Sequence, residues 1–201
     1  MKLISWNLLH RAGATLGEIE KLIALEQPDL LLMQETTDQM DDLPSLVGGH
    51  YARAPLPDRR HGLAVWSPAP LHQVPEILTL RSGLLIRRVC QIIELGPFAV
   101  ANVHLSHGQV LNRRQLRHIA QILPSRAAIL GDCNLIGPPL LRDFQDVGPR
   151  QPTHAAGTII PLRLDRCFVR GLICERAEML RKGMSDHWPI AVWLSAAGHA
   201  E

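Results

Sequence analysis

The chain has 201 residues, of which 46% are hydrophobic, and its 21 basic and 19 acidic residues give a net charge of +2. This length supports one hydrophobic core rather than two, so we expect a single domain over residues 1–201. The near balance of charge differs from that of a protein that coats nucleic acid through bulk positive charge. Any preference for a polyanion must therefore come from local clusters of side chains.

The four cysteines, Cys90, Cys133, Cys167 and Cys174, form no Cys-x-x-Cys pair and match no zinc-binding spacing. We expect them to be reduced, buried side chains. The N-terminus lacks an apolar run long enough for a secretory signal, and no segment approaches the ~20 apolar residues that span a membrane. The sequence therefore predicts a cytoplasmic protein.

The beginning of the chain predicts a strand, a helix and a second strand. Residues 3–9 alternate and are rich in apolar side chains, which is typical of a strand. Residues 15–26 repeat apolar side chains with helical spacing, and Thr15 is a suitable N-cap. Residues 29–34 form a short apolar run that predicts a buried strand ending at Glu35.

The middle of the chain is rich in predicted strands. Residues 62–66 predict one strand, and residues 87–95 and 98–105 predict two more that flank a Gly-Pro pair, as in a hairpin. Residues 112–123 then place apolar side chains at i, i+3, i+4 and i+7, which predicts a helix.

A buried strand over residues 127–130 is followed by an irregular stretch over 137–161 that is rich in proline and glycine. Strands are expected again over residues 163–169, 172–180 and 188–194. Many strands with two or three helices, and no regular alternation of the two, favour a layered α/β sandwich of mixed sheets.

Polar side chains recur where the predicted strands end. Oxygen-rich side chains that converge at strand ends suit a hard divalent cation such as Mg²⁺. Any one of them alone is also explained as a solvated strand end, so the prediction depends on the whole set, which is Asn7, Glu35, Asp132, Asn134, Asp165, Asp186 and His187.

Two short segments carry most of this signal. In residues 131–134, Gly-Asp-Cys-Asn, the glycine permits a sharp turn, and the carboxylate and amide can face one pocket. An Asx turn after a strand explains the same residues. Residues 185–187, Ser-Asp-His, place an acid beside an imidazole just before a buried strand, and a loop with a hydrogen-bonded histidine is the alternative.

Six short motifs occur in order along the chain. They are Ser5-Trp6-Asn7, Gln34-Glu35-Thr36, Asn102-Val103-His104-Leu105, Gly131-Asp132-x-Asn134, Leu164-Asp165-Arg166 and Ser185-Asp186-His187-x-Pro189. Together they resemble the endonuclease/exonuclease/phosphatase superfamily, which includes deoxyribonuclease I, exonuclease III-type endonucleases, inositol polyphosphate 5-phosphatases and neutral sphingomyelinases. The resemblance implies a four-layer α/β/β/α sandwich of two mixed sheets and a phosphodiesterase that uses Mg²⁺ or Mn²⁺, with one or two ions left open.

The resemblance also implies a role for each matching position. Glu35 is expected to be the principal metal ligand, with Asn7 and Asp186 near the same ion. Asp132 and Asn134 are expected to orient the attacking water and to contact the scissile phosphate.

Three further residues complete the expected catalytic set. His187 would act as a general base or as a donor to the phosphoryl oxygens, and Asp165 would hold its ring. His104 would bind the phosphate or assist the leaving group.

Substrate-binding residues are suggested by two weaker signals. Arg113 and Arg114 belong to a basic helical face that would attract a polyanion or an anionic lipid surface, although a solvated helix face explains them equally well. Thr153, followed by His154, lies in the irregular stretch and is a candidate for substrate contact, with a plain loop as the favoured alternative.

The leading hypothesis for function is a nuclease that acts on DNA or RNA, as a monomer without a stable protein partner. A phosphodiesterase acting on a phospholipid or another small phosphoester is the second, and a catalytically inactive binding module is a remote third. In the superfamily that the chain resembles, abasic-site endonucleases usually have a tyrosine-containing motif where this chain has residues 102–106, Asn-Val-His-Leu-Ser. The only tyrosine, Tyr51, lies elsewhere, which argues against a dedicated abasic-site enzyme.

Overall fold

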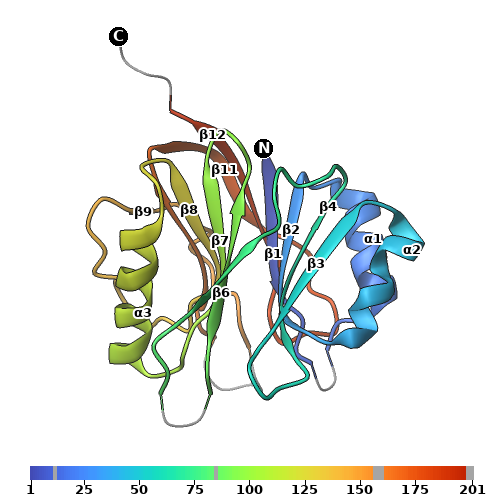
Figure 1. The fold of residues 1–201 in the computed structure, drawn as a ribbon, viewed down its shortest axis with the longest axis horizontal. Helices are drawn as coiled ribbons and strands as arrows, with labels where there is room; N and C mark the ends of the chain where they lie inside the picture. The colour runs from blue at the N-terminus through green and yellow to red at the C-terminus, as the bar shows by residue number, and fades with distance from the viewer. Residues whose placement is uncertain (11–12, 84–85, 156–160, 198–201) are drawn as a thin grey trace.

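The computed structural model describes residues 1–10, 13–83, 86–155 and 161–197. Two six-stranded mixed sheets pack face to face at the centre of the molecule (Figure 1). One outer face is covered by α1 (Leu16–Glu26) and α2 (Leu43–Val47), and the other by α3 (Gln109–Ile122). The expected four-layer sandwich of two mixed sheets is confirmed.

The first sheet has the strand order β11-β12-β1-β2-β4-β3. The central pair, β1 and β2, is parallel, and its other neighbouring pairs are antiparallel. Its strands are β1 (Lys2–Asn7), β2 (Leu30–Thr36), β3 (His50–Pro55), β4 (Gly62–Ser67), β11 (Leu172–Met179) and β12 (Ile190–Ala196).

The second sheet repeats this arrangement, with the order β5-β6-β7-β8-β10-β9 and a parallel central pair of β7 and β8. The carboxyl ends of parallel neighbours lie at the same edge, so each sheet brings two strand ends together. Its strands are β5 (Glu76–Thr79), β6 (Val89–Glu94), β7 (Ala99–His104), β8 (Ala127–Asp132), β9 (Gln145–Asp146) and β10 (Asp165–Arg170).

Apolar side chains fill the space between the sheets, among them Leu32 of β2 and Leu130 of β8, both fully buried. A polar contact crosses the same space. The amide of Gln34 donates to Oδ1 of Asn102 at 2.9 Å, and Nδ2 of Asn102 donates to the carbonyl of Ala64 at 3.0 Å. Such a polar contact, with its hydrogen bonds satisfied inside an apolar core, fixes the position of one sheet relative to the other.

The helices follow from local signals. Thr15 caps α1 in a full capping box with Glu18, and the buried face of α1 packs on the first sheet. The α3 helix begins at Gln109, three residues before the predicted start, because Gly108 is its N-cap and accepts the amide of Asn112 at 2.9 Å.

Each strand predicted from the sequence is present, with bounds that differ by a few residues. The hairpin is also confirmed, since β6 and β7 are antiparallel and the amide of Leu95 donates to Phe98 across the turn. The prediction missed α2, the six-residue strand β3 and the shorter strands β5 and β9. The strand β9 lies in the stretch predicted to be irregular, of which residues 156–160 are outside the described residues.

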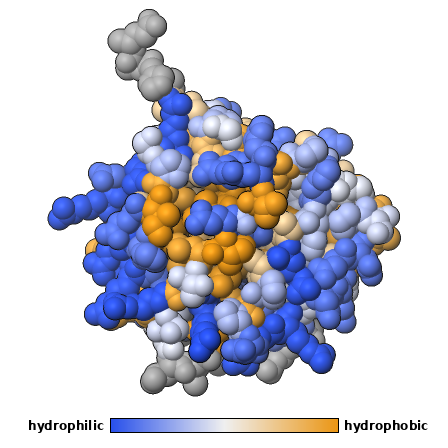
Figure 2. All heavy atoms as spheres, in the orientation of Figure 1, coloured by the Kyte–Doolittle hydropathy of each residue, from blue (hydrophilic) through white to orange (hydrophobic). Residues whose placement is uncertain are grey.

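Figure 2 shows hydrophobic side chains in the middle of one face, over the sheets, and mainly hydrophilic ones over α3. Among the described residues, no helix combines the length and apolar character needed to span a membrane. The cysteines are free thiols; Cys90, Cys133 and Cys167 are buried, and Cys174 is half-buried.

Candidate active site

A cleft of about 460 Å³ opens at the edge where the carboxyl ends of the two parallel strand pairs meet. The segments before β10 and β12 complete its walls. Seven of the eight predicted catalytic and metal-binding residues line it, and the eighth, Asp165, lies directly behind. The lining residues are Asn7, Leu9, Glu35, His104, His107, Gln109, Asp132, Asn134, Ile136, His154, Leu162, Leu164, Asp186 and His187.

Glu35 reaches the cleft because the pairing of β2 with β4 shifts register at this position, between Gln34 and Thr36. Its backbone has φ of +57°, a left-handed conformation that is rare for a residue with a long side chain. Irregularities of this kind redirect a side chain and are common beside active sites. The Glu35 carboxylate contacts the ring of His10 and lies 4.0 Å from Nε2 of His104.

The close approach of β8 to β7 depends on Gly131, which lies within β8. Its φ is +147°, and a Cβ atom added there would lie 2.2 Å from the carbonyl oxygen of Val103 on the parallel neighbour β7. A glycine is therefore required for β7 and β8 to approach closely where they enter the site. The residues that follow are the carboxylate Asp132 and the amide Asn134, whose backbone NH donates to Oδ1 of Asp132 at 2.9 Å.

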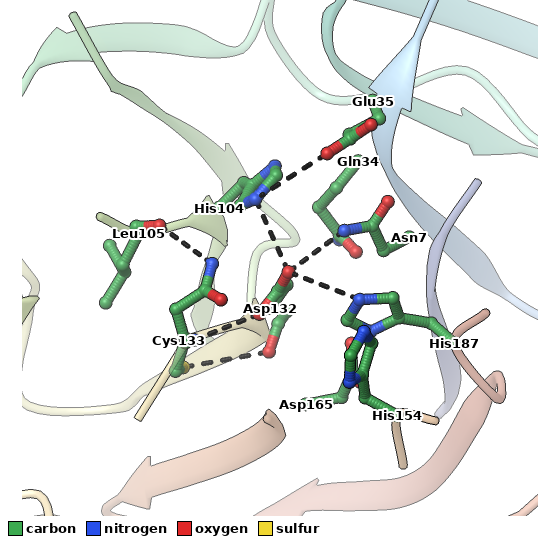
Figure 3. Close-up of polar contacts among 12 residues, drawn as sticks. Asn7, Gln34, Glu35, His104, Leu105, Asp132, Cys133, His154, Asp165 and His187 are labelled. Carbon is green, nitrogen blue, oxygen red and sulfur yellow. Dashed lines mark hydrogen bonds and ion pairs between the residues drawn. The ribbon is translucent and has the colours of Figure 1, made fainter. Parts of the chain in front are cut away.

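The other carboxylate oxygen of Asp132, Oδ2, is the atom around which the polar side chains of the cleft gather (Figure 3). Nδ2 of Asn7 donates to it at 2.9 Å, and Nε2 of His104 and of His187 lie 3.4 and 3.8 Å away. Burial raises the pKa of Asp132; nearby Asp165 adds to this rise, and His187 opposes it. The carboxylate is thus placed to hold or release a proton within the cleft.

His187 is fixed from both sides. Its Nδ1 is 2.8 Å from Oδ2 of buried Asp165, and its backbone NH donates to Oγ of Ser185 at 3.1 Å. Burial disfavours the imidazolium, but the carboxylates of Asp165 and Asp132 outweigh it and raise the pKa of His187 to about 10. The contact with Asp165 holds the charged ring so that Nε2 faces the cleft.

His104 has the opposite character. Its side chain is almost fully buried, and burial, with a contribution from the positive charge of Arg88, holds the pKa of His104 well below its ordinary value. The cleft therefore contains a neutral imidazole on β7 facing a charged one near β12, and both lie close to Asp132.

His154 lines the cleft. From the sequence, a plain loop was the favoured interpretation of this residue, and a position at the substrate site was the alternative. It forms an isolated antiparallel bridge with His187, the two rings are 4.5 Å apart, and Nε2 of His154 lies 3.4 Å from Oδ2 of Asp186. The Thr-His pair in the sequence was the available signal. The pairing with His187 is a tertiary contact that no local pattern reveals.

The residues proposed to bind substrate lie elsewhere. The hydroxyl of Thr153 is buried and accepts the backbone NH groups of Leu164 and Asp165 at 3.1 and 2.9 Å, so it supports Asp165 from behind. Arg113 donates to the carbonyls of Gln109, Ile136 and Pro138, which ties α3 to the loop after β8. Arg114 is exposed on α3, outside the lining of the cleft.

Three basic side chains near the site had no signal in the sequence. His10 contacts Glu35 and stacks on His61, with ring centroids 4.1 Å apart. Burial by itself raises the pKa of Glu35, but the bonds and charge of His10 outweigh it and lower that pKa. Arg88 is buried, and its Nε and Nη1 have no hydrogen-bond partner among the described residues.

Two sets of side chains in the described part of the chain have ligand atoms close enough to share a metal ion. One is Asp132, Asp165 and His187, and the other is His154, Asp186 and His187. Oδ1 atoms of Asp165 and Asp186 are buried without a hydrogen-bond partner, so both carboxylates have unused capacity to bind a cation or a donor.

Comparison with known proteins shows that other chains share this fold. Three solved structures share the fold over almost their whole length. An endonuclease/exonuclease/phosphatase from Bacteroides vulgatus is 16% identical with a TM-score of 0.80, covering 97% of this chain and 98% of its own. Danio rerio TDP2, complexed with single-strand DNA product, is 16% identical with a TM-score of 0.78, covering 98% and 99%.

A functionally unknown conserved protein from Enterococcus faecalis is 18% identical with a TM-score of 0.75, covering 98% of this chain and 100% of its own. No curated protein sequence matches the chain. The sequence model of the endonuclease/exonuclease/phosphatase family matches residues 4–187, and the chain belongs to that family.

Proposed function

We propose that this protein is a divalent-metal-dependent phosphodiesterase, and that its substrate is a nucleic acid. The observation that carries the proposal is the convergence on Oδ2 of Asp132. Its neighbours are an amide donor, a neutral imidazole and a charged imidazole, all within 3.8 Å of one buried oxygen. Such a set can activate a water molecule and also offset the negative charge that develops on a phosphoryl group.

The cleft has side chains suited to a hard cation. Glu35, Asn7 and Asp186 would hold it, since all three line the cleft and offer oxygen atoms, which Mg²⁺ prefers. The buried Oδ1 of Asp186, which has no partner, is the kind of atom that such an ion satisfies. When bound, the cation would offset the charge of the phosphodiester as a Lewis acid.

Asp132 is the side chain best placed to accept the proton of the attacking water. Its pKa is raised by burial, which brings it closer to the range in which a carboxylate serves as a base. The amides of Asn7 and Asn134 restrict the orientation of the carboxylate, through Nδ2 of Asn7 and the backbone NH of Asn134.

His187 serves as a donor to the phosphoryl oxygens. Of the two roles that the sequence left open, the raised pKa favours the donor, because a ring with a pKa of about 10 is protonated at neutral pH. Asp165 holds Nδ1 at 2.8 Å and directs Nε2 into the cleft. His104, neutral and 3.4 Å from Asp132, is placed to contact the phosphate from the opposite wall.

Two observations support a nucleic acid as the substrate. The structural neighbour from Danio rerio is complexed with single-strand DNA product. The exposed arginines Arg114 and Arg117 lie on α3, whose first residue, Gln109, lines the cleft, and their positive charge would attract a polyanion.

A substrate panel tests the proposal. Protein stripped of metal and then supplied with Mg²⁺ or Mn²⁺ is incubated with plasmid DNA, single-stranded DNA, RNA, a chromogenic phosphodiester and a phospholipid. We expect metal-dependent hydrolysis of a nucleic acid and of the chromogenic ester. Turnover of the phospholipid alone would contradict the nucleic-acid substrate, and no turnover of any substrate would contradict the proposed activity.

A further inference from the structure

The side chains of His154, Asp186 and His187 form a cluster at one wall of the cleft, and their chemistry differs from that of Glu35 and Asn7. Two imidazoles and one carboxylate suit a transition metal such as Zn²⁺, whereas Mg²⁺ prefers oxygen ligands. We propose that this cluster is a binding site for Zn²⁺, and that Zn²⁺ bound there inhibits the enzyme by occupying Nε2 of His187.

The backbone holds the two histidines side by side. His154 and His187 form an antiparallel bridge, flanked by hydrogen bonds from the amide of Trp188 to Thr153 at 2.8 Å and from the amide of Ala155 to Asp186 at 3.0 Å. Residues opposite each other in such a pair present their side chains on the same face. The cluster is therefore set by the fold and does not depend on a flexible side chain reaching across the cleft.

One ligand–ligand distance in the cluster matches that of a zinc site, and the other atoms lie within reach of one. With Zn–ligand bonds of about 2.0–2.2 Å, tetrahedral ligands lie roughly 3.3–3.6 Å apart. Nε2 of His154 is 3.4 Å from Oδ2 of Asp186. Nε2 of His187 is 4.0 Å from Oδ1 of Asp186, which a small rotation of the carboxylate would close. All three side chains offer atoms within 4.8 Å of one another.

Two further features point to a ligand here. Oδ1 of Asp186 is buried without a hydrogen-bond partner, although its side chain retains 25% exposure and that of His154 retains 16%, so that an ion can enter from solvent. Nδ1 of His187 is held by the carboxylate of Asp165 at 2.8 Å. A carboxylate behind a histidine is the usual support of a zinc-binding imidazole.

Inhibition follows from the proposed function, on which this half of the inference rests. Nε2 of His187 would release its proton to solvent when it binds Zn²⁺. It could then no longer donate to a phosphoryl oxygen, and Asp186 would be withdrawn from the Mg²⁺ site. Zn²⁺ binding itself needs no catalytic activity, and it is therefore measured separately.

The test measures Zn²⁺ binding to the metal-free protein by titration calorimetry, for wild type, His154→Gln, Glu35→Gln and His118→Gln. His118 is exposed on α3 and provides the matched control. We expect one Zn²⁺ per chain in the wild type, at least tenfold weaker binding in His154→Gln, and wild-type affinity in His118→Gln and Glu35→Gln. Circular dichroism confirms that each variant is folded, and Co²⁺, whose visible absorption reports tetrahedral nitrogen ligation, repeats the comparison.

Equal Zn²⁺ affinity in wild type and His154→Gln would overturn the site. Equal weakening in Glu35→Gln and His154→Gln would also overturn it, because the ion would then belong to the Glu35 site. In the Mg²⁺-dependent assay, the Zn²⁺ concentration for half-inhibition should rise in His154→Gln by the same factor as the dissociation constant. Zn²⁺ binding that leaves wild-type activity intact would contradict inhibition and leave the proposed function standing.

Discussion

At the scale of single residues, the cleft depends on one buried histidine whose charge is set by its neighbours. His187 lies between Asp165 and Asp132, and both carboxylates favour the imidazolium. The same pair of contacts fixes the direction of Nε2. The chemistry of the site is thus determined by side chains that approach from β8, β10 and the segment before β12.

Replacing His187 by alanine should lower kcat/KM by about 10²–10⁴, the usual contribution of a positioned proton donor or base. The comparison is made on a chromogenic phosphodiester with Mg²⁺. His118→Ala, which removes an exposed imidazole on α3, should leave the rate unchanged. A loss below tenfold in His187→Ala would count against the role given to this ring.

The contact between Asp165 and His187 should also make stability depend on pH. The pKa of His187 is raised from about 6.5 in the unfolded chain to about 10 in the folded protein, so the charged ring stabilises the fold. This stabilisation is fully present below pH ~6.5 and is lost as pH rises through about 10.

The variant Asp165→Asn removes the main partner of the charged ring. Its deficit in the free energy of unfolding, measured by urea denaturation, should therefore be largest near pH 6.5 and should shrink towards pH 10. NMR of the ring should show a lower pKa for His187 in the variant. A deficit that stays constant or grows with pH would refute this account.

At the scale of elements, the site depends on how strands end. The carboxyl ends of β1 and β2 lie together, as do those of β7 and β8, and the irregularity at Glu35 turns its side chain into the cleft. Gly131 allows β7 and β8 to approach at the point where they enter the site.

Replacing Gly131 by alanine should destabilise the protein by more than about 2 kcal/mol, because the added Cβ would lie 2.2 Å from the carbonyl oxygen of Val103 and φ is +147°. Gly17→Ala is the control. Gly17 lies in α1 with no atom within 4 Å of an added Cβ, and alanine there should add up to about 1 kcal/mol. Chemical denaturation measures both, and equal stabilities would exclude a special role for Gly131.

Sequence patterns predict the elements whose burial is regular and fail for the rest. The strands β2 and β8 begin as buried apolar runs, over residues 30–33 and 127–130, and both were predicted. The strand β5 is mostly exposed, and β9 has two residues, so neither carries an alternation that a pattern could detect. The five-residue helix α2 has a proline in its first turn and is too short for helical periodicity.

The residues of the candidate site likewise include some that the sequence predicts and some that it does not. Its motif residues were predicted by the resemblance to a family, which carries position as well as residue type, and seven of them line one cleft. His154 and Arg88 reach the site through tertiary contacts. The sequence offered His154 only as the less favoured interpretation of a Thr-His pair, and it gave no sign of Arg88. Thr153 was a candidate for substrate contact, whereas its hydroxyl accepts a hydrogen bond from the backbone NH of Asp165.

At the scale of the whole molecule, the two sheets meet in one core, and a few polar side chains cross it. Asn102 of β7 donates to the carbonyls of Met33 and Ala64, and it accepts from Gln34, so it links the second sheet to the first. This link lies behind the cleft, and it holds β2, which carries Glu35, in a fixed position relative to β7, which carries His104.

Replacing Asn102 by alanine should cost about 2 kcal/mol or more, because it leaves the buried amide of Gln34 and two carbonyls with fewer partners. Gln121→Ala, an exposed amide on α3, should change stability by less than about 0.5 kcal/mol. Urea denaturation compares the two. A loss in Asn102→Ala no larger than that in Gln121→Ala would show that the link between the sheets contributes little.

The most direct test of the central claim is the Mg²⁺ dependence of phosphodiester hydrolysis in wild type, Glu35→Gln and Glu20→Gln, with metal-stripped protein and a chromogenic phosphodiester. Glu35 lies in the cleft, whereas Glu20 is exposed on α1 and controls for loss of a carboxylate. We predict Mg²⁺-dependent turnover in wild type and Glu20→Gln, and none in a folded Glu35→Gln. Turnover in Glu35→Gln at the wild-type rate, with the same Mg²⁺ dependence, would contradict the account.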